Sequence, residues 1–182
     1  MTDRPGAAAD GTATGMENAM VNAREILGAI PLFAEVLDAD QLGRLAAKCH
    51  EVIFPVGALL MTEEDFGTSM FALVEGEVSV TLADKRGDAH GVAKLSAGDF
   101  VGEMSLLTGA RRSATVVAET EVAAIEITKV ALEEILTQAP DLIDRFGLVL
   151  ASRQAELDRA AADVAQANKD DLISQIKRFF GR

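Results

Sequence analysis

The chain has 182 residues, of which 49% are hydrophobic, which is enough for one domain with a hydrophobic core. Its 17 basic and 29 acidic residues give a net charge of −12, and such a surface repels the phosphates of nucleic acids. The single cysteine, Cys49, excludes an intramolecular disulfide. A single cysteine suits a reducing compartment, so we expect a cytoplasmic protein. Because neither a secretory signal nor a long apolar run is found, we expect no membrane span.

The N-terminal part of the chain has helical patterns. Residues 1–15 are rich in Gly, Ala, Thr and Asp without a periodic apolar face, which predicts a disordered tail. From residue 16 to residue 30 apolar residues recur three to four apart, which predicts a helix that Pro31 interrupts. A second, short helix is expected over residues 38–49.

After His50 the apolar residues alternate with a period of two, which is typical of half-buried strands. Glu75-Gly76 and the polar run 84–88 have the composition of hairpin turns, and residues 116–118 and 122–127 are expected to form a further strand pair. Many short strands with frequent turns favour a β-barrel or jelly roll. The expected strand segments are 52–54, 59–61, 71–73, 78–82, 92–95, 116–118 and 122–127.

Helical patterns return in the C-terminal part. Thr128 is the expected N-cap of a helix that reaches Gln138, and Pro140 starts a longer one. In that longer helix Leu150, Leu157 and Val164 are spaced by seven, so it is able either to pack on a partner or to lie on its own domain. Residues 166–182 are expected to form a C-terminal helical tail.

The segment FVGEMSLLTGARRSAT, residues 100–115, has the chemistry of a phosphate site. A short helical turn after Gly102 would present unpaired N–H groups to an anion, while Arg112 adds a guanidinium and Ser113 a hydroxyl. The carboxylate of Glu103 would repel phosphate but accept a hydrogen bond from a sugar hydroxyl. These groups together favour a ribose phosphate. The alternative is that Arg111 and Arg112 are solvent-facing loop residues.

The order of these residues closely resembles the phosphate-binding cassette of the cyclic nucleotide-binding domain family. The resemblance extends upstream to residues 55–57, 65–71 and 76–80 and covers roughly residues 28–155. It implies an α+β fold, an antiparallel β-roll or jelly roll with flanking N-terminal helices and a C-terminal lid helix, over a domain of residues 16–165. The matching cassette residues are Phe100, Gly102, Glu103, Ser105, Leu106, Leu107, Gly109, Arg112, Ser113, Ala114 and Thr115.

The resemblance also implies a role for each site residue. Arg112 would pair with the cyclic phosphate, and Glu103 would accept from the ribose 2′-hydroxyl. The base would lie between the roll and the lid helix, where Arg153 is expected to cap it unless it is a solvated helix-face charge. The remaining residues, expected to line the phosphate and sugar mainly through backbone N–H groups or a hydroxyl, are Gly102, Met104, Ser105, Ser113 and Ala114.

Two residues depart from the family pattern. Glu64 stands where the family usually has glycine, and Thr68 replaces a common aspartate. We expect the first change to affect the geometry of that loop more than ligand binding, and neither change touches the cassette.

The function expected is therefore a regulatory module that binds cAMP or cGMP, with no other cofactor, and whose C-terminal helix repositions on binding. His50 and His90 are forty residues apart and show no metal-ligand pattern, and no nucleophile–histidine–acid set stands out, so neither a metal site nor an enzyme is expected. Two alternatives stay open: an interaction scaffold of the same fold that binds nothing, and a transcription regulator of the catabolite-activator type. The partners considered are an effector domain or a second copy bound through the C-terminal helix.

Overall fold

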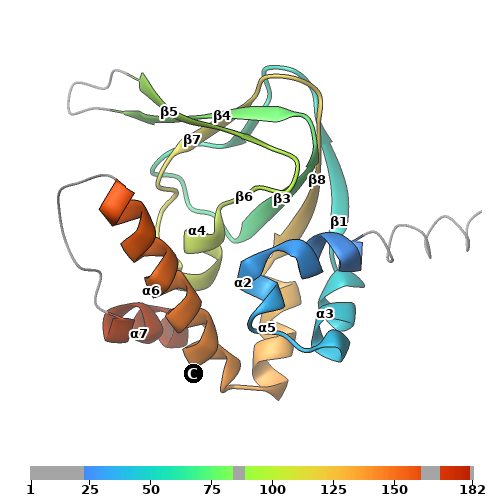
Figure 1. The fold of residues 1–182 in the computed structure, drawn as a ribbon, viewed down its shortest axis with the longest axis vertical. Helices are drawn as coiled ribbons and strands as arrows, with labels where there is room; N and C mark the ends of the chain where they lie inside the picture. The colour runs from blue at the N-terminus through green and yellow to red at the C-terminus, as the bar shows by residue number, and fades with distance from the viewer. Residues whose placement is uncertain (1–22, 84–88, 161–168, 181–182) are drawn as a thin grey trace, which may run out of the picture.

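The computed structural model describes residues 23–83, 89–160 and 169–180, although the side chains of residues 153–160 and 169–172 lie outside that description (Figure 1). The expected disordered tail over residues 1–15 lies outside the described residues. Residues 23–29 are helical. The helices that follow are α2 (Pro31–Ala34), α3 (Ala39–Ala46), α4 (Glu103–Thr108), α5 (Lys129–Gln138), α6 (Leu142–Ala160) and α7 (Lys169–Phe179). The strands are β1 (His50–Phe54), β2 (Leu59–Met61), β3 (Ser69–Glu75), β4 (Glu77–Ala83), β5 (Ala89–Ser96), β6 (Phe100–Val101), β7 (Thr115–Ala118) and β8 (Val122–Thr128).

The strands form two four-stranded antiparallel sheets, one in the order β1-β8-β3-β6 and the other in the order β2-β7-β4-β5. Figure 1 shows the sheets rolled together on one side of the molecule and the helices gathered on the other. The fold class expected from the sequence, a β-roll with flanking helices and a C-terminal helix, is confirmed. The hairpin expected around residues 84–88 is supported by the pairing of Ala83 with Ala89, while the turn itself lies outside the described residues.

Two expected strand pairs are wrong. The chain does not form a hairpin at Glu75-Gly76, because β3 and β4 belong to different sheets, and β7 and β8 are likewise in different sheets. Both segments are corners where the chain crosses from one sheet to the other, and they contact each other: the N–H of Glu77 donates to Thr120 Oγ1 at 2.9 Å. Alternation of apolar residues identifies a strand but not its partner, so the sequence did not reveal these crossings.

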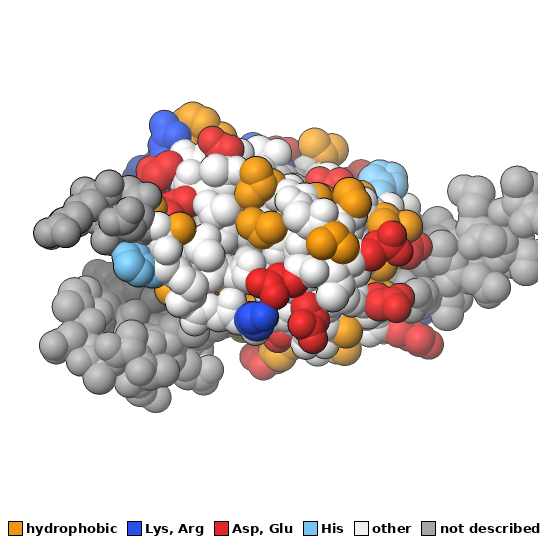
Figure 2. Space-filling model, turned by 90° about the horizontal axis from the view of Figure 1, so that it is seen from above, with side chains coloured by type: hydrophobic (Ala, Val, Ile, Leu, Met, Phe, Trp, Pro, Cys, Tyr) orange, Lys and Arg blue, Asp and Glu red, His pale blue; other side chains and the backbone are white. Residues whose placement is uncertain are grey.

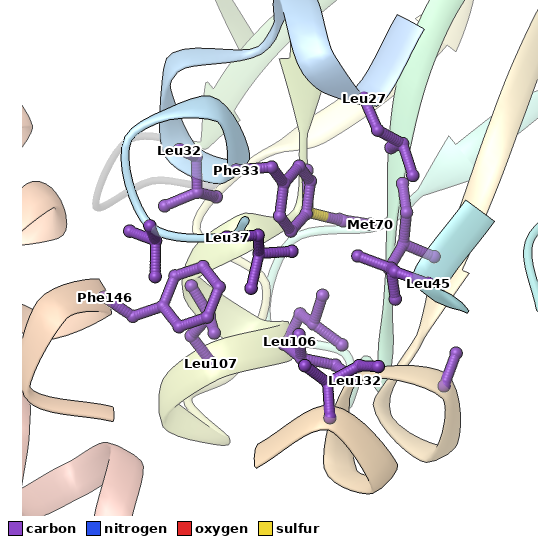
Figure 3. Close-up of a cluster of buried hydrophobic side chains, with 14 of the residues drawn as sticks. Leu27, Leu32, Phe33, Leu37, Leu45, Met70, Leu106, Leu107, Leu132 and Phe146 are labelled. Carbon is purple, nitrogen blue, oxygen red and sulfur yellow. The ribbon is translucent and has the colours of Figure 1, made fainter. Parts of the chain in front are cut away.

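The central part of β3, in the first sheet, is buried on both faces, with one hydrophobic core on each side of it. Met70 and Ala72 of β3 pack against the helices, while Phe71 and Leu73 point into the roll, as the period of two along a strand requires. Figure 3 shows Phe33, Met70, Leu106, Leu132 and Phe146 pointing into one cluster between the helices and the sheet. The cassette helix α4 is therefore anchored in the larger core through its apolar side.

The helix boundaries have identifiable local causes. Asp38 caps α3 in a capping box, since its side chain accepts from the N–H groups of Asp40 and Gln41 while the Gln41 side chain accepts from the Asp38 N–H. Thr128 caps α5 as expected, with its side chain accepting from the N–H of Ala131. Pro31 occupies the start of the short α2, where its missing N–H costs no helical hydrogen bond.

The face seen from above the roll carries hydrophobic side chains interspersed with acidic ones, and few basic ones (Figure 2). This distribution agrees with the net charge of −12. Among the described helices, none combines the length and the apolar character needed to cross a bilayer.

Candidate functional site

Within the cassette, Gly102 precedes α4 with a φ of +89°, and Gly109 follows α4 with a φ of +72°. Both values are left-handed, a region that favours glycine, so glycines at the two ends of α4 fit its geometry. The N–H of Leu106 donates to the carbonyl oxygen of Gly102 at 3.1 Å, which makes it the first residue bonded within this helix. The N–H groups of the preceding turn are therefore not used by the helix itself.

Arg112 is the one buried basic side chain of the described residues, with 5% of its surface exposed. Its Nη1 donates to the carbonyl oxygen of Gly102 at 3.2 Å. Glycines leave the space that the guanidinium fills: a Cβ at Gly67 would lie 2.0 Å from Nε, and one at Gly102 would lie 2.4 Å from Nη1. Gly67 and Gly102 therefore allow the guanidinium to lie against their backbone.

The backbone of Arg112 is fixed by the loop between β2 and β3. Its N–H donates to the carbonyl oxygen of Asp65 at 2.8 Å, and its own carbonyl oxygen accepts from the N–H of Glu64 at 2.9 Å. Glu64 has a φ of +67°. Glu64, where the family usually has glycine, thus has a left-handed backbone conformation. Its loop pairs with the segment that carries Arg112.

The charge of Arg112 has no carboxylate partner in an ion pair within the part of the chain that the structure describes. Burial lowers the pKa of the guanidinium, whereas the charges of Glu103 and Glu126 oppose that shift. Because an arginine stays protonated in proteins at neutral pH, the site holds a buried cation whose described side-chain hydrogen bond goes to a neutral backbone carbonyl oxygen. Burying such a cation is costly without an anion, so the geometry suits an anionic ligand.

A pocket of about 270 Å³ adjoins Arg112. Phe66 and Leu59 line this pocket, and 77% and 56% of their surfaces are exposed. Apolar groups are therefore available to a ligand beside the cation. Of the eight ligand residues expected from the sequence, Arg112 alone lines this pocket within the described residues. The lining consists of Leu59, Leu60, Met61, Thr62, Asp65, Phe66 and Arg112.

The other expected site residues lie before and after Arg112 in the cassette, except for Arg153. Glu103 and Met104 are half-buried in the first turn of α4, next to Ser105, which is 2% exposed. Ser113 is exposed and Ala114 half-buried in the segment that leads into β7. The backbone of Arg153 lies in α6, but its side chain lies outside the described residues.

Two residues that contact the arginines, Gly67 and Phe66, were not among the site residues expected from the sequence. Gly67 packs on the Arg112 guanidinium, and Phe66 lies under the Arg111 guanidinium, with Cζ 4.1 Å from the ring centroid. Arg111 also donates to the carbonyl oxygen of Glu64 and is otherwise exposed. The signal in the sequence was the Phe66-Gly67 pair itself, an aromatic beside a glycine in a polar loop, whose contact with the cassette became visible only in the fold.

Comparison with known proteins finds cyclic nucleotide-binding domains similar to this chain in sequence and in fold. A family model described as the cyclic nucleotide-binding domain matches residues 51–139. The crystal structure of a cyclic nucleotide-binding domain from Methylobacillus flagellatus is similar with a TM-score of 0.65 and 24% identity, covering 82% of this chain and 89% of that chain. At this identity the structural likeness supports the fold.

Two relatives are larger proteins that contain a segment similar to this chain. A cyclic nucleotide-gated potassium channel of Rhizobium etli is 34% identical over 120 residues, which cover 66% of this chain and 32% of the channel. The cAMP-activated global transcriptional regulator CRP of Escherichia coli is 29% identical over 128 residues, which cover 70% of this chain and 61% of the regulator. The chain thus spans about a third of the channel and less than two thirds of the regulator.

Proposed function

Residues 51–139 belong to the cyclic nucleotide-binding domain family, and from this premise we propose that the protein binds cAMP or cGMP at Arg112 as a regulatory module. The observation that carries the proposal is the buried guanidinium of Arg112, which is 5% exposed and lies beside a pocket without a carboxylate partner among the described residues. A cyclic phosphate supplies the missing anion in a form that two N–H groups of a guanidinium are able to grip.

The cassette supplies the remaining contacts of the proposed complex. Glu103, in the first turn of α4, accepts a hydrogen bond from the ribose 2′-hydroxyl. Ser105 is buried, so its part is its backbone N–H, whereas the exposed Ser113 offers its hydroxyl as well. The residues proposed to surround the phosphate and sugar through their backbone are Gly102, Met104, Ser105, Ser113 and Ala114.

The proposed signal is a change in the position of α6. Its first half is fixed, because Phe146 and Leu150 are buried in the larger core. Figure 1 shows its second half extending away from the other helices, toward the side where β4 and β5 lie. A ligand that contacts this half would favour one position of α6 over another. Arg153, at the start of that half, is proposed to cap the base.

The proposed role is binding without catalysis. The relatives described above are a channel and a transcription regulator. The cassette holds an arginine, a carboxylate assigned to the ribose and backbone donors, and none of these is a base or nucleophile aimed at the phosphate. We propose a cytoplasmic module that acts on an effector domain or on a second copy, with the cyclic nucleotide as its ligand and no other cofactor.

Calorimetric titration of the purified chain with cAMP and with cGMP tests this function, with 5′-AMP as the control. Micromolar or tighter binding of a cyclic form, with 5′-AMP much weaker, is the expected result, and the ratio of the two cyclic forms gives the preference. If folded protein free of co-purified ligand binds neither, the protein is an interaction scaffold of the same fold, and the regulatory assignment is wrong.

A further inference from the structure

Helix α7 packs against the domain beside α6 and α4 (Figure 1). Ile176 and Phe180 are 0% and 5% exposed and belong to the larger core. Along α6, Gly147 leaves room for Ile173, since a Cβ at Gly147 would lie 2.4 Å from Ile173 Cγ1. From Ile173 onward the helix therefore packs on the domain through apolar side chains, and its last turn reaches the cassette.

Phe179, in that last turn, lies against the end of the cassette helix. A Cβ at Gly109 would lie 2.3 Å from Cδ2 and 2.7 Å from Cε2 of the Phe179 ring, so the ring rests directly on the Gly109 backbone. Gly109 ends α4 and opens the loop that leads to Arg112 three residues later. A shift of the ring would therefore move the backbone that precedes Arg112.

The same ring also contacts the second segment that holds Arg112. Lys129 Nζ lies 4.2 Å from the Phe179 ring centroid, a cation–π contact. The N–H of Lys129 donates to the carbonyl oxygen of Thr68 at 2.7 Å, and Thr68 follows Gly67, on which the Arg112 guanidinium packs. Phe179 thus contacts one residue on each of the two paths that lead to this guanidinium.

We propose that Phe179 is a positioning residue for Arg112, so that docking of α7 and occupation of the phosphate site are coupled. The proposal rests on the function proposed above for Arg112. It follows from geometry on both sides of the guanidinium: the ring fixes Gly109 on the cassette side and Lys129 on the side of the Gly67 loop. Release of α7 then removes the contacts with both Gly109 and Lys129, and so loosens the backbone on both sides of the Arg112 guanidinium.

Such a coupling works in both directions. If docked α7 holds Arg112 in place for the phosphate, the phosphate in turn favours docked α7 by the same factor. A second protein that captured α7 would weaken ligand binding, and ligand would weaken that capture. Docking of α7 is therefore a second change, separate from the movement of α6, that would report occupation of the phosphate site.

The test compares three variants of the full chain. Phe179→Ala removes the ring from both Gly109 and Lys129, and Phe179→Tyr keeps the ring. Ile173→Ala is the matched control, because it removes a half-buried apolar group from the same helix at a contact with Gly147 of α6 rather than with the cassette. Each variant is measured by hydrogen exchange of residues 102–115 without ligand and by calorimetric titration with cAMP and cGMP.

We expect Phe179→Ala to speed exchange of residues 102–115 and to weaken binding of the preferred nucleotide by at least about fivefold. Phe179→Tyr should leave the exchange rate and the affinity close to those of the unmodified chain, and Ile173→Ala should change both much less than Phe179→Ala does. Equal effects of Phe179→Ala and Ile173→Ala would overturn the positioning role, because loss of α7 packing alone would then explain them. If the unmodified chain binds neither nucleotide, the function of Arg112 falls, while selective loosening of the cassette by Phe179→Ala would still establish the contact's role.

Discussion

The N–H of Glu64 donates to the carbonyl oxygen of Arg112 at 2.9 Å, and Glu64 makes this bond with a φ of +67°. A left-handed backbone costs a residue with a side chain about 1–2 kcal/mol, whereas glycine adopts it freely. The family's usual glycine at this position fits that backbone, and the present chain keeps the conformation without it. The loop that pairs with Arg112 is thus held in a strained form.

Replacement of this residue should therefore stabilise the protein. We expect Glu64→Gly to raise the free energy of unfolding by about 0.5–1 kcal/mol, the relief of strain less the greater entropy of glycine in the unfolded chain. Chemical denaturation measures it. Glu64→Ala is the control, because it removes the carboxylate but keeps the strain, and an equal gain in both variants would show that charge rather than backbone is responsible.

The two adjacent arginines should differ in their effect on binding. Arg112 is buried beside the pocket, whereas Arg111 is exposed and lies over Phe66. A charged hydrogen bond contributes about 1.5–3 kcal/mol, so we expect Arg112→Ala to weaken cyclic nucleotide binding more than tenfold and Arg111→Ala to weaken it much less. Calorimetry on both variants decides the matter, and similar losses would refute the assignment of the phosphate to Arg112.

Ligand should also slow hydrogen exchange in α6. The second half of this helix is the proposed lid, and contact with the ligand would reduce its local opening. We expect slower exchange over residues 151–160 in saturating ligand, with little change in α5, which is seated in the core through Leu132 and Ile135. Unchanged exchange in both helices would remove the lid from the mechanism and leave α7 as the route for the signal.

Cys49 should be inert in the folded protein. Burial raises the pKa of its thiol to about 12, with a smaller effect from the charge of Glu126, and Sγ donates to the carbonyl oxygen of Leu45 at 3.3 Å. Because the thiolate is the nucleophile, iodoacetamide at pH 8 should modify the denatured chain and leave the native chain unmodified. Rapid modification of the native chain would contradict the raised pKa.

The same shift gives a sign for the alkaline pH dependence of stability. The folded state favours the neutral thiol, so the unfolded chain loses this proton first, near the ordinary pKa of 9.0. The contribution of Cys49 is therefore complete below pH 9 and is lost as the pH rises toward about 12. Cys49→Ala should lose less stability than the unmodified chain over that interval, as denaturation at a series of pH values would measure.

The sequence predicted local features well and long-range contacts poorly. The cap at Thr128 and the short helix after Gly102 follow from residue type and spacing, and both are confirmed. By contrast, the contact between Gly67 and Arg112 joins segments 45 residues apart in the chain, and no period or motif encodes it. The same limit explains the crossings at Gly76 and Thr120, where alternation showed strands without showing which sheet each one joins.

The contact between Gly109 and Phe179 makes a final prediction about stability. A methyl group at Gly109 meets two separate costs: the left-handed φ of +72°, and a ring carbon 2.3 Å away. Gly109→Ala should therefore destabilise the chain by more than the about 1–2 kcal/mol that the backbone alone would cost. Phe179→Ala removes the ring but leaves the φ unchanged, so in that background the same methyl group should meet only the backbone cost.

A double-mutant cycle on the free energy of unfolding isolates the difference. We expect Gly109→Ala to be less destabilising in the Phe179→Ala background than in the unmodified chain, with a coupling of about 0.5–3 kcal/mol. Gly98→Ala serves as the control, because Gly98 has a φ of +92° but open space around a Cβ, so its cost should be the same in both backgrounds. Additive costs for Gly109 and Phe179 would mean that the ring does not rest on the cassette in solution.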